Sequence, residues 1–326
     1  MDDAPEREEV TATVGQRGGQ THKNHDTLTE PNLPQLVFSS VDLPDSTIND
    51  KENRWMLGRR FCTSPGVHYI LPNDEEEVDR LISQHYFIRS LFGNRDFLSP
   101  VHIILQSGAK VLDAGCGPGT WAMEMASEYP NSQFYGIDIS NMFPLHSKPS
   151  NCTFQIANIL KKLSFEDNKF DFPGGYVEIV DADYSIQCDE RATMKLIDGI
   201  YNTLRARDIH PSWGRRVGDI LQTMGVEDVQ SLTQRFPVGK HSDRDGRSGL
   251  EQWMRFLIAM RPHLAQVMYI SGDEYDELLQ RASQELSMNE ISIEVMCTYG
   301  KKPLKLVKDD ERIEMQPEDQ HKPEDK

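Results

Sequence analysis

The sequence predicts an α/β fold in which a twisted, mostly parallel sheet carries helices on both faces. From residue 109 onward, short apolar runs alternate with helical patterns, as in repeated strand–helix–strand units. A glycine-rich loop joins the first of these runs to the helix that follows it, and such loops mark ligand sites in parallel sheets. We therefore expect one ordered domain over residues 53–306, with a helical insertion over the cleft at the ends of the strands.

Four apolar runs are the predicted strands of this sheet, because each is short and rich in residues that favour strands. They are AKVLDAG (109–115), QFYGIDIS (133–140), CTFQIANI (152–159) and YVEIVDAD (176–183). Residues 120–129 have apolar side chains at helical spacing, and Pro130 ends that pattern.

The segments on either side of these runs are mainly helical. A helix is predicted over 74–91 with Asn73 as its N-cap, and a second from Ser99 with Pro100 in its first turn. The remaining elements follow in chain order: mainly helix over 189–224, a strand over 228–239, two helices over 248–287 and a terminal strand over 291–303.

The acidity of the chain is concentrated at its two ends. The net charge of the 326 residues is −17, of which residues 1–52 carry −7, residues 307–326 carry −4 and the rest −6. Both end segments are poor in apolar residues, so we expect disordered acidic tails. An acidic surface repels phosphate backbones, so nucleic acid is not an expected partner.

The cysteines and the N-terminal sequence indicate a cytoplasmic or nuclear protein. Five cysteines lie far apart and none forms a C-x-x-C pair, which favours reduced thiols and gives no spacing typical of a metal site. The N-terminus has no apolar signal segment, and no apolar run approaches the roughly 20 residues that span a bilayer. No membrane association is expected.

The sequence VLDAGCGPGTW (111–121) is the motif that carries chemistry. Gly115, Gly117 and Gly119 let the backbone turn tightly and approach a ligand closely. Asp138 stands 19 residues after Gly119, at the end of the next predicted strand. A carboxylate at that place can accept both hydrogen bonds of a ribose diol, so a nucleoside ligand is predicted.

The spacing of the loop favours S-adenosylmethionine (SAM) over a nicotinamide or flavin nucleotide. A nicotinamide fingerprint would place its third glycine at 120, which is Thr, and no Arg or Lys lies in the loop to meet a phosphate. SAM has no phosphate but ends in an amino acid. Asp113 can either orient the loop or meet the SAM ammonium group, and Trp121 can wall the cofactor. A glycine turn that binds nothing is the structural alternative.

The segment from Val111 to Ser140 resembles motif I through the second strand of class I SAM-dependent methyltransferases, which have a Rossmann-like fold. GRRF (58–61), YILPNDEEEVDRL (69–81) and YGKKP (299–303) resemble the fungal branch related to LaeA, a regulator of secondary metabolism. The resemblance covers about residues 53–303. It implies methyl transfer to a small-molecule or protein acceptor. The alternative is a LaeA-like regulatory scaffold that binds partner proteins through its acidic tails, with weak or no catalysis.

The resemblance also assigns roles to matching positions. It places Gly115, Cys116, Gly117 and Gly119 under the methionine part of SAM, Asp138 and Ile139 at the ribose and the adenine edge, and Asn158 and Ile159 at the adenine amino group. In many relatives a carboxylate stands at the position of Asn158, whose side-chain carbonyl can still accept a hydrogen bond.

The stretch after the third predicted strand is shorter than the resemblance implies. KFDF (169–172) looks like the start of a strand, yet YVEIV follows after only three residues, and parallel neighbours need a crossover of a dozen or more. In relatives a strand and two helices come between these segments. We therefore expect that this block is absent after Phe172, by a splice or gene-model deletion, or that YVEIV has moved beside the first strand.

No catalytic residue is fixed by the sequence, but four candidates stand near the expected cleft. Three follow the YVEIV strand at its carboxyl end and the fourth lies beside a Pro and a Trp; they are Asp181, Asp183, Tyr184 and His210. Arg59 and Arg60 are candidate partners for the SAM carboxylate. Trp253 and Met254, at helical spacing, are expected in the core rather than at the substrate.

Overall fold

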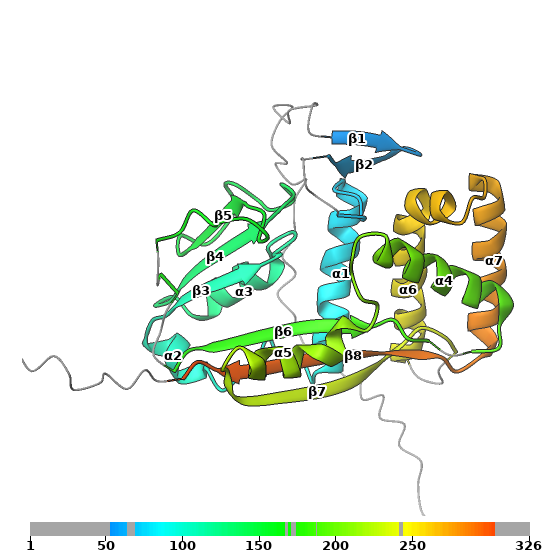
Figure 1. Ribbon diagram of the computed structural model, residues 1–326. Coiled ribbons are helices and arrows are strands. Elements are labelled where there is room, and N and C mark those ends of the chain that lie inside the picture. Colours follow the sequence, from blue (N-terminus) through cyan, green and yellow to red (C-terminus); the bar gives the residue numbers. More distant parts are fainter. Residues whose placement is uncertain are drawn as a thin grey trace, which may run out of the picture. The chain divides into compact units, whose positions relative to one another are not determined.

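The computed structural model describes residues 53–63, 69–166, 169–170, 174–186, 188–240 and 244–303. They form an α/β fold with an N-terminal hairpin, a parallel three-stranded sheet and an antiparallel three-stranded sheet (Figure 1). The predicted α/β class is therefore confirmed. The expected acidic tails lie outside the described residues. None of the described helices is long and apolar enough to cross a lipid bilayer.

The parallel sheet consists of β3 (Lys110–Ala114), β4 (Gln133–Asp138) and β5 (Cys152–Ile156), in that order. Helix α3 (Thr120–Glu128) connects β3 to β4 and buries its apolar face against Phe134 of β4. Three of the four predicted strands and the helix between them are thus confirmed, which places the glycine loop at the carboxyl end of β3.

The fourth predicted strand forms but belongs to a different sheet. It is β6 (Tyr176–Asp183), which pairs antiparallel with β8 (Ser292–Lys301), and β8 also pairs with β7 (Glu227–Pro237). Among the described strands, β3 pairs only with β4 and β6 only with β8. The expectation of a parallel fourth strand was wrong, and β6 has not moved beside β3. The physical reason is that β8 offers β6 an unbroken register of eight residue pairs.

The KFDF segment does not begin a strand in its described part. Lys169 and Phe170 lie in a turn, and the Phe170 ring packs edge-on against Tyr135 with 5.4 Å between ring centroids. The Lys169 ammonium lies 4.0 Å from the centroid of the same Tyr135 ring. Aromatic packing on β4 has therefore replaced strand pairing at 169–170, and residues 171–173 lie outside the described part.

An N-terminal hairpin leads into a long helix. Strands β1 (Asn53–Met56) and β2 (Arg59–Cys62) pair antiparallel, and the two residues between them both have positive φ angles, as a type I′ turn requires. Helix α1 (Glu75–Leu91) follows, and its N-cap is Asp74, not the expected Asn73, because Asp74 accepts from the Glu77 N–H at 3.1 Å. Arg59 donates to both oxygens of Asp74, so it anchors α1 instead of reaching a cofactor.

The second helix starts later than its sequence suggests. Helix α2 spans His102–Ser107, because Leu98 and Ser99 donate their N–H groups to the Glu178 carboxylate of β6, at 3.0 and 2.7 Å. On the other side of the same segment, the Trp121 indole donates to the Asp96 carbonyl at 2.7 Å. Residues 96–99 therefore tie α3 of the parallel sheet to β6 of the antiparallel sheet.

The C-terminal half supplies the helical insertion. It comprises α4 (Arg191–Arg205), the 3₁₀ helix η2 (Trp213–Arg216), α5 (Val217–Thr223), α6 (Arg244–Val267) and α7 (Gly272–Met288). Helices α4, α6 and α7 pack on one another around a core that includes Leu196, Leu264 and the fully buried Tyr275. Helix α1 packs against α6, against β7 of the antiparallel sheet, and against α3, which itself packs on the parallel sheet (Figure 1).

The Glu178 contact gives a stability prediction. We expect Glu178→Ala to lower the free energy of unfolding by about 2 kcal/mol or more, because two backbone donors lose a charged acceptor. The matched control is Glu227→Ala, which removes an exposed carboxylate from β7 and should cost less than about 0.5 kcal/mol. Urea unfolding of both variants measures the difference, and equal costs would contradict the role assigned to Glu178.

Candidate functional site

The glycine loop is held open by its own backbone conformation. Gly115, Gly117 and Gly119 have φ angles of +81°, +51° and +76°, which side chains with a Cβ rarely adopt. The N–H groups of Gly115 and Cys116 donate to the Ile137 carbonyl at 2.8 and 3.0 Å. The loop is therefore fixed to the end of β4, with its remaining backbone turned outward from the strand.

Asp138 connects the loop to the end of β4 through its side chain. One carboxylate oxygen accepts from the Gly117 N–H and the other from the Ser140 N–H, both at 2.9 Å. Burial raises the pKa of Asp138, although these two hydrogen bonds oppose the increase. Each oxygen keeps a second lone pair, so the carboxylate can shape the loop and still accept a ribose hydroxyl.

Asp113 carries an unsatisfied carboxylate oxygen beside the loop. Its Oδ2 is buried and has no hydrogen-bond partner among the described residues. Burial, with a contribution from the Asp138 charge, raises the pKa of Asp113 to about 7. An orphaned acceptor of this kind is costly unless a ligand pairs with it. The donor that fits is a cationic group, such as the ammonium of SAM.

The other predicted cofactor residues fall into two groups. Cys116, Ile139, Asn158 and Ile159 lie at the strand ends on the same edge of the parallel sheet as the loop. The Asn158 side-chain carbonyl accepts from the Leu160 N–H at 2.9 Å, so it shapes the turn after β5. Trp121 directs its indole N–H to Asp96 and packs on Phe134, which assigns it a role between elements instead of a cofactor wall.

A cavity of about 190 Å³ lies among α1, α6 and the strands of the antiparallel sheet. Its lining includes Leu81 of α1, Asp181 of β6, Tyr184, and Trp253 and Phe256 of α6. A Cβ placed on Gly117 would lie 3.6 Å from Leu81 Cδ1, so Leu81 stands between the loop and the cavity.

Three aromatic rings form one wall of the cavity. Tyr184 stacks on Phe256 and on Trp253, with centroid distances of 6.0 and 6.3 Å, and Trp253 lies 5.4 Å from Phe256. Trp253 is 2% exposed, so it belongs to the core as expected and also lines the cavity. The same aromatic side chains therefore pack in the core and form the wall of the cavity.

The structure separates the four catalytic candidates. Asp181 and Tyr184 line the cavity. Asp183 is buried and ion-paired with Arg215; although burial opposes it, hydrogen bonds from Ser185 and Arg215 hold the pKa of Asp183 below its usual range. His210 lies on the surface, where its Nδ1 accepts from the Ser212 N–H. Asp183 and His210 are therefore not among the residues that line the cavity.

Sequence reasoning missed a buried ion pair under the cavity. Arg80 donates to both carboxylate oxygens of Glu77, at 2.9 and 2.7 Å, and to the side-chain carbonyl oxygen of Gln84, at 2.5 Å. Both partners of the pair are almost fully buried, and Arg80 lines the cavity. Burial, together with the charges of Glu77 and Asp138, raises the pKa of the nearby Tyr69. The only sequence signal was a Glu and an Arg three residues apart within the helical pattern.

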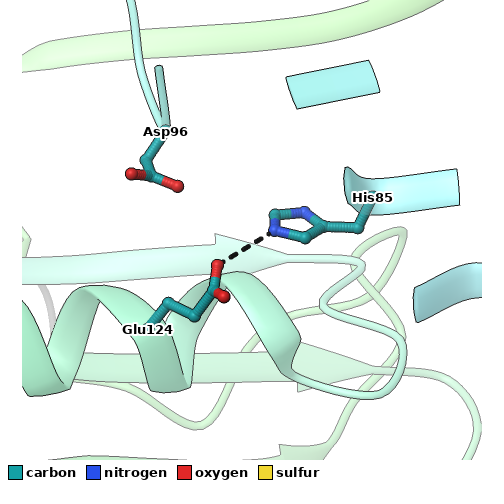
Figure 2. Close-up of side chains that lie close together, drawn as sticks. All are labelled: His85, Asp96 and Glu124. Atoms are coloured by element: carbon teal, nitrogen blue, oxygen red, sulfur yellow. Dashed lines mark hydrogen bonds and ion pairs between the residues drawn. The ribbon is translucent and has the colours of Figure 1, made fainter. Parts of the chain in front are cut away.

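A His–Asp–Glu cluster lies away from the cavity, between α1 and α3. Figure 2 shows His85, Asp96 and Glu124 close together, with His85 Nε2 at 3.2 Å from the Glu124 carboxylate. Their sequence spacing gave no hint of the cluster, because each comes from a different segment. The Arg89 guanidinium lies 3.0 Å from Asp96 and 3.4 Å from Glu124, so it pairs with both carboxylates and offsets one of their two charges. The cluster is therefore an ion-pair network that joins the two helices.

The packing around Gly119 predicts how much stability is lost when one methyl group is added there. A Cβ on Gly119 would overlap the Phe154 ring in addition to straining a φ of +76°. We expect Gly119→Ala to cost roughly 2–5 kcal/mol of stability, against roughly 1–2 for Gly225→Ala, which has a φ of +81° and open space around it. Thermal and urea unfolding compare the two variants. A similar cost at both positions would show that Phe154 moves aside.

Comparisons with known proteins agree with this geometry. Residues 105–189 match the family described as a methyltransferase domain. Methyltransferase str2 of Strobilurus tenacellus is 27% identical over 217 residues, which cover 57% of this chain and 77% of that protein. Secondary metabolism regulator LAE1 of Cochliobolus heterostrophus is 24% identical over 252 residues, covering 67% and 80%. Secondary metabolism regulator laeA of Coprinopsis cinerea is 28% identical over 267 residues, covering 72% and 59%.

Solved structures that match this chain include a SAM complex of phosphoethanolamine N-methyltransferase 2 from Haemonchus contortus. It is 18% identical, with a TM-score of 0.40, over 75% of this chain and 62% of that one. The family match spans the glycine loop, Asp113 and Asp138, which are the residues that the sequence singled out. Residues 105–189, which include that loop, are therefore similar to a methyltransferase domain, and the chain is similar to fungal methyltransferases and LaeA-type regulators.

Proposed function

We propose that this chain transfers a methyl group from SAM to an acceptor held in the cavity beside the glycine loop. The observation that carries the proposal is the loop itself. Three of its glycines have the left-handed backbone conformation, and the Gly117 N–H donates to the Asp138 carboxylate. The family match over residues 105–189 supports the same assignment. The relatives named as methyltransferases support it further.

The chain's contribution to such a reaction is positioning. SAM, when bound, supplies a methyl group on a positively charged sulfur, so the donor is already activated and orientation of the acceptor can provide much of the acceleration. In this assignment the loop holds the methionine part of SAM, Asp113 meets its ammonium group and Asp138 its ribose. Leu81 of the cavity lining is also the side chain that a Cβ on Gly117 would approach, at 3.6 Å from its Cδ1, so it links the cavity to the loop.

A regulatory role is the second candidate. Several relatives are named as secondary metabolism regulators, and the chain covers 80% of one of them. In the described part of the chain the parallel sheet also ends at β3, on the side where a block was expected to be missing. In this reading the domain binds partner proteins and catalysis is weak or absent. Binding of S-adenosylhomocysteine (SAH) without turnover on a panel of small molecules and cell extract would favour it.

The ribose assignment is tested at Asp138. We expect Asp138→Ala to weaken SAH binding by about ten- to a hundredfold, because a charge-assisted hydrogen-bond pair is lost. Isothermal titration calorimetry measures the dissociation constant, and thermal unfolding checks that the loop change has not unfolded the domain. Asp189→Ala, which removes an exposed carboxylate, is the control. An unchanged dissociation constant in Asp138→Ala would refute the assignment.

The Asp113 assignment predicts a pH dependence. Its carboxyl, with a pKa of about 7, is neutral at low pH, so pairing with the SAH ammonium requires loss of that proton. SAH affinity should therefore rise about tenfold per pH unit as the pH approaches 7 from below, and level off above it. Asp113→Asn should bind more weakly with a flat profile between pH 5 and 8. If both proteins show the same slope, another group is responsible.

A further inference from the structure

The His–Asp–Glu cluster brings together three segments that are far apart in the chain. His85 lies on α1, Asp96 in the segment before α2 and Glu124 on α3, and their side chains converge (Figure 2). Each offers one atom of a kind that binds metal ions, and these three atoms all lie within 4.8 Å of one another. The side chains are 20%, 12% and 22% exposed, so the cluster is largely shielded from water.

The distances in the cluster fit a small divalent ion. A tetrahedral zinc ion has bonds of about 2.0–2.2 Å to a His nitrogen or a carboxylate oxygen, which places two of its ligand atoms roughly 3.3–3.5 Å apart. His85 Nε2 lies 3.2 Å from Glu124 Oε2, close to that separation. Asp96 needs a shift of at most about 1.5 Å to become the third ligand. Three protein ligands and one water are a known set for zinc.

One of the three ligand atoms accepts no hydrogen bond. Asp96 Oδ1 is buried and has no hydrogen-bond donor among the described residues, although the Arg89 Nε lies 3.0 Å away. Burial raises the pKa of Asp96, the Arg89 charge opposes the increase and the Glu124 charge adds to it. A buried carboxylate oxygen with an unsatisfied lone pair favours a ligand that approaches from another direction.

Neighbouring residues hold both carboxylates in place. The Tyr86 hydroxyl donates to Glu124 Oε1 at 2.8 Å, which leaves Oε2 beside His85. The Trp121 indole donates to the Asp96 carbonyl at 2.7 Å and fixes the backbone that carries this side chain. Hydrogen bonds of this kind around a ligand set orient the ligands of metal sites.

The charge of the cluster is only partly matched by Arg89. Its guanidinium supplies one positive charge against two carboxylates, whereas a divalent ion would match both. Arg89 lies in the last turn of α1 and its side chain is 26% exposed, so the guanidinium can turn into water on its long apolar stem. Arg89 and a metal ion are therefore competitors for the same two carboxylates.

We propose that His85, Asp96 and Glu124 bind one divalent metal ion of the zinc type, with the Arg89 guanidinium as the competing cation. His85 coordinates through Nε2, so the proton of its neutral ring lies on Nδ1. An imidazole nitrogen beside two carboxylates suits zinc, whereas magnesium and calcium prefer oxygen ligands. The ion joins α1 to α3, the helix that begins at the glycine loop. The proposal does not depend on methyl transfer.

Zinc titration of the full chain tests the site. After metal has been removed with a chelator, we expect one zinc ion to bind per chain by isothermal titration calorimetry, and magnesium at the same concentration to show no binding. Cobalt, used in place of zinc, should give visible absorption without the thiolate-to-cobalt charge-transfer band that cysteine ligands produce. Absence of zinc binding, equal binding of magnesium, or a thiolate band would overturn the proposal.

Paired variants locate the ion. His85→Asn should weaken zinc binding at least about tenfold, whereas His146→Asn, which removes an exposed His, should leave it unchanged. Glu124→Gln should also weaken it at least about tenfold and keeps an acceptor for the Tyr86 hydroxyl. It serves as the second variant if His85→Asn does not fold, which thermal unfolding shows. Zinc affinity that survives the loss of His85 or of Glu124 would place the ion elsewhere and overturn the proposal.

Arg89 provides a test in the opposite direction. Arg89→Met removes the competing cation and keeps an unbranched side chain, so zinc should bind about tenfold more tightly. Without zinc this variant should unfold at a lower temperature than the natural chain, because two carboxylates lose their partner, and zinc should restore the difference. A cluster that is only an ion-pair network predicts the loss of stability without the gain in zinc affinity. Unchanged zinc affinity in Arg89→Met, or zinc binding in that variant alone, would contradict the proposal.

Discussion

The buried ion pair between Glu77 and Arg80 is the interaction on which both halves of the site depend. The two side chains are 0% and 3% exposed, and removal of either partner would leave an uncompensated charge at a cost of about 3–5 kcal/mol. The pair fixes Arg80 against Gln84 and Phe256, and Leu81, the next residue of α1, then stands between Gly117 and the cavity. The pair also neutralises Arg80, which is the cationic residue in the cavity lining.

The elements that the sequence predicted well are those whose signals are local. A glycine loop between an apolar strand and an amphipathic helix can be recognised from the nineteen residues between Lys110 and Glu128, and β3, the loop and α3 lie where expected. The N-cap of α1 shows the limit of that reasoning. Asn73 and Asp74 are both good caps, but the Asn73 side chain is engaged by Asn53 and Arg60 of the hairpin, so Asp74 caps the helix.

The features that were not predicted depend on contacts between distant residues. Glu178 reaches Leu98 across eighty positions, and Gln252 reaches Ser83 across 169. A periodic pattern in the sequence does not indicate such contacts. The cavity depends on them, because α1, β6 and α6 are far apart in the chain. The glycine loop could thus be predicted from the sequence. On the acceptor side the sequence indicated Asp181 and Tyr184, but not the residues that surround them in the cavity.

The pairing of β6 explains why carboxylates of this strand bind backbone N–H groups. In the described residues β6 has one strand neighbour, β8, and a second neighbour would otherwise occupy backbone N–H groups along its other edge. One side chain of β6 takes part of that role, because Asp181 accepts from the Ala182 N–H of the same strand. Glu178 instead accepts from the N–H groups of Leu98 and Ser99, which lie before α2. Carboxylates are strong acceptors for backbone donors, so one can serve a strand edge without a strand neighbour and another can hold a segment that joins the two sheets.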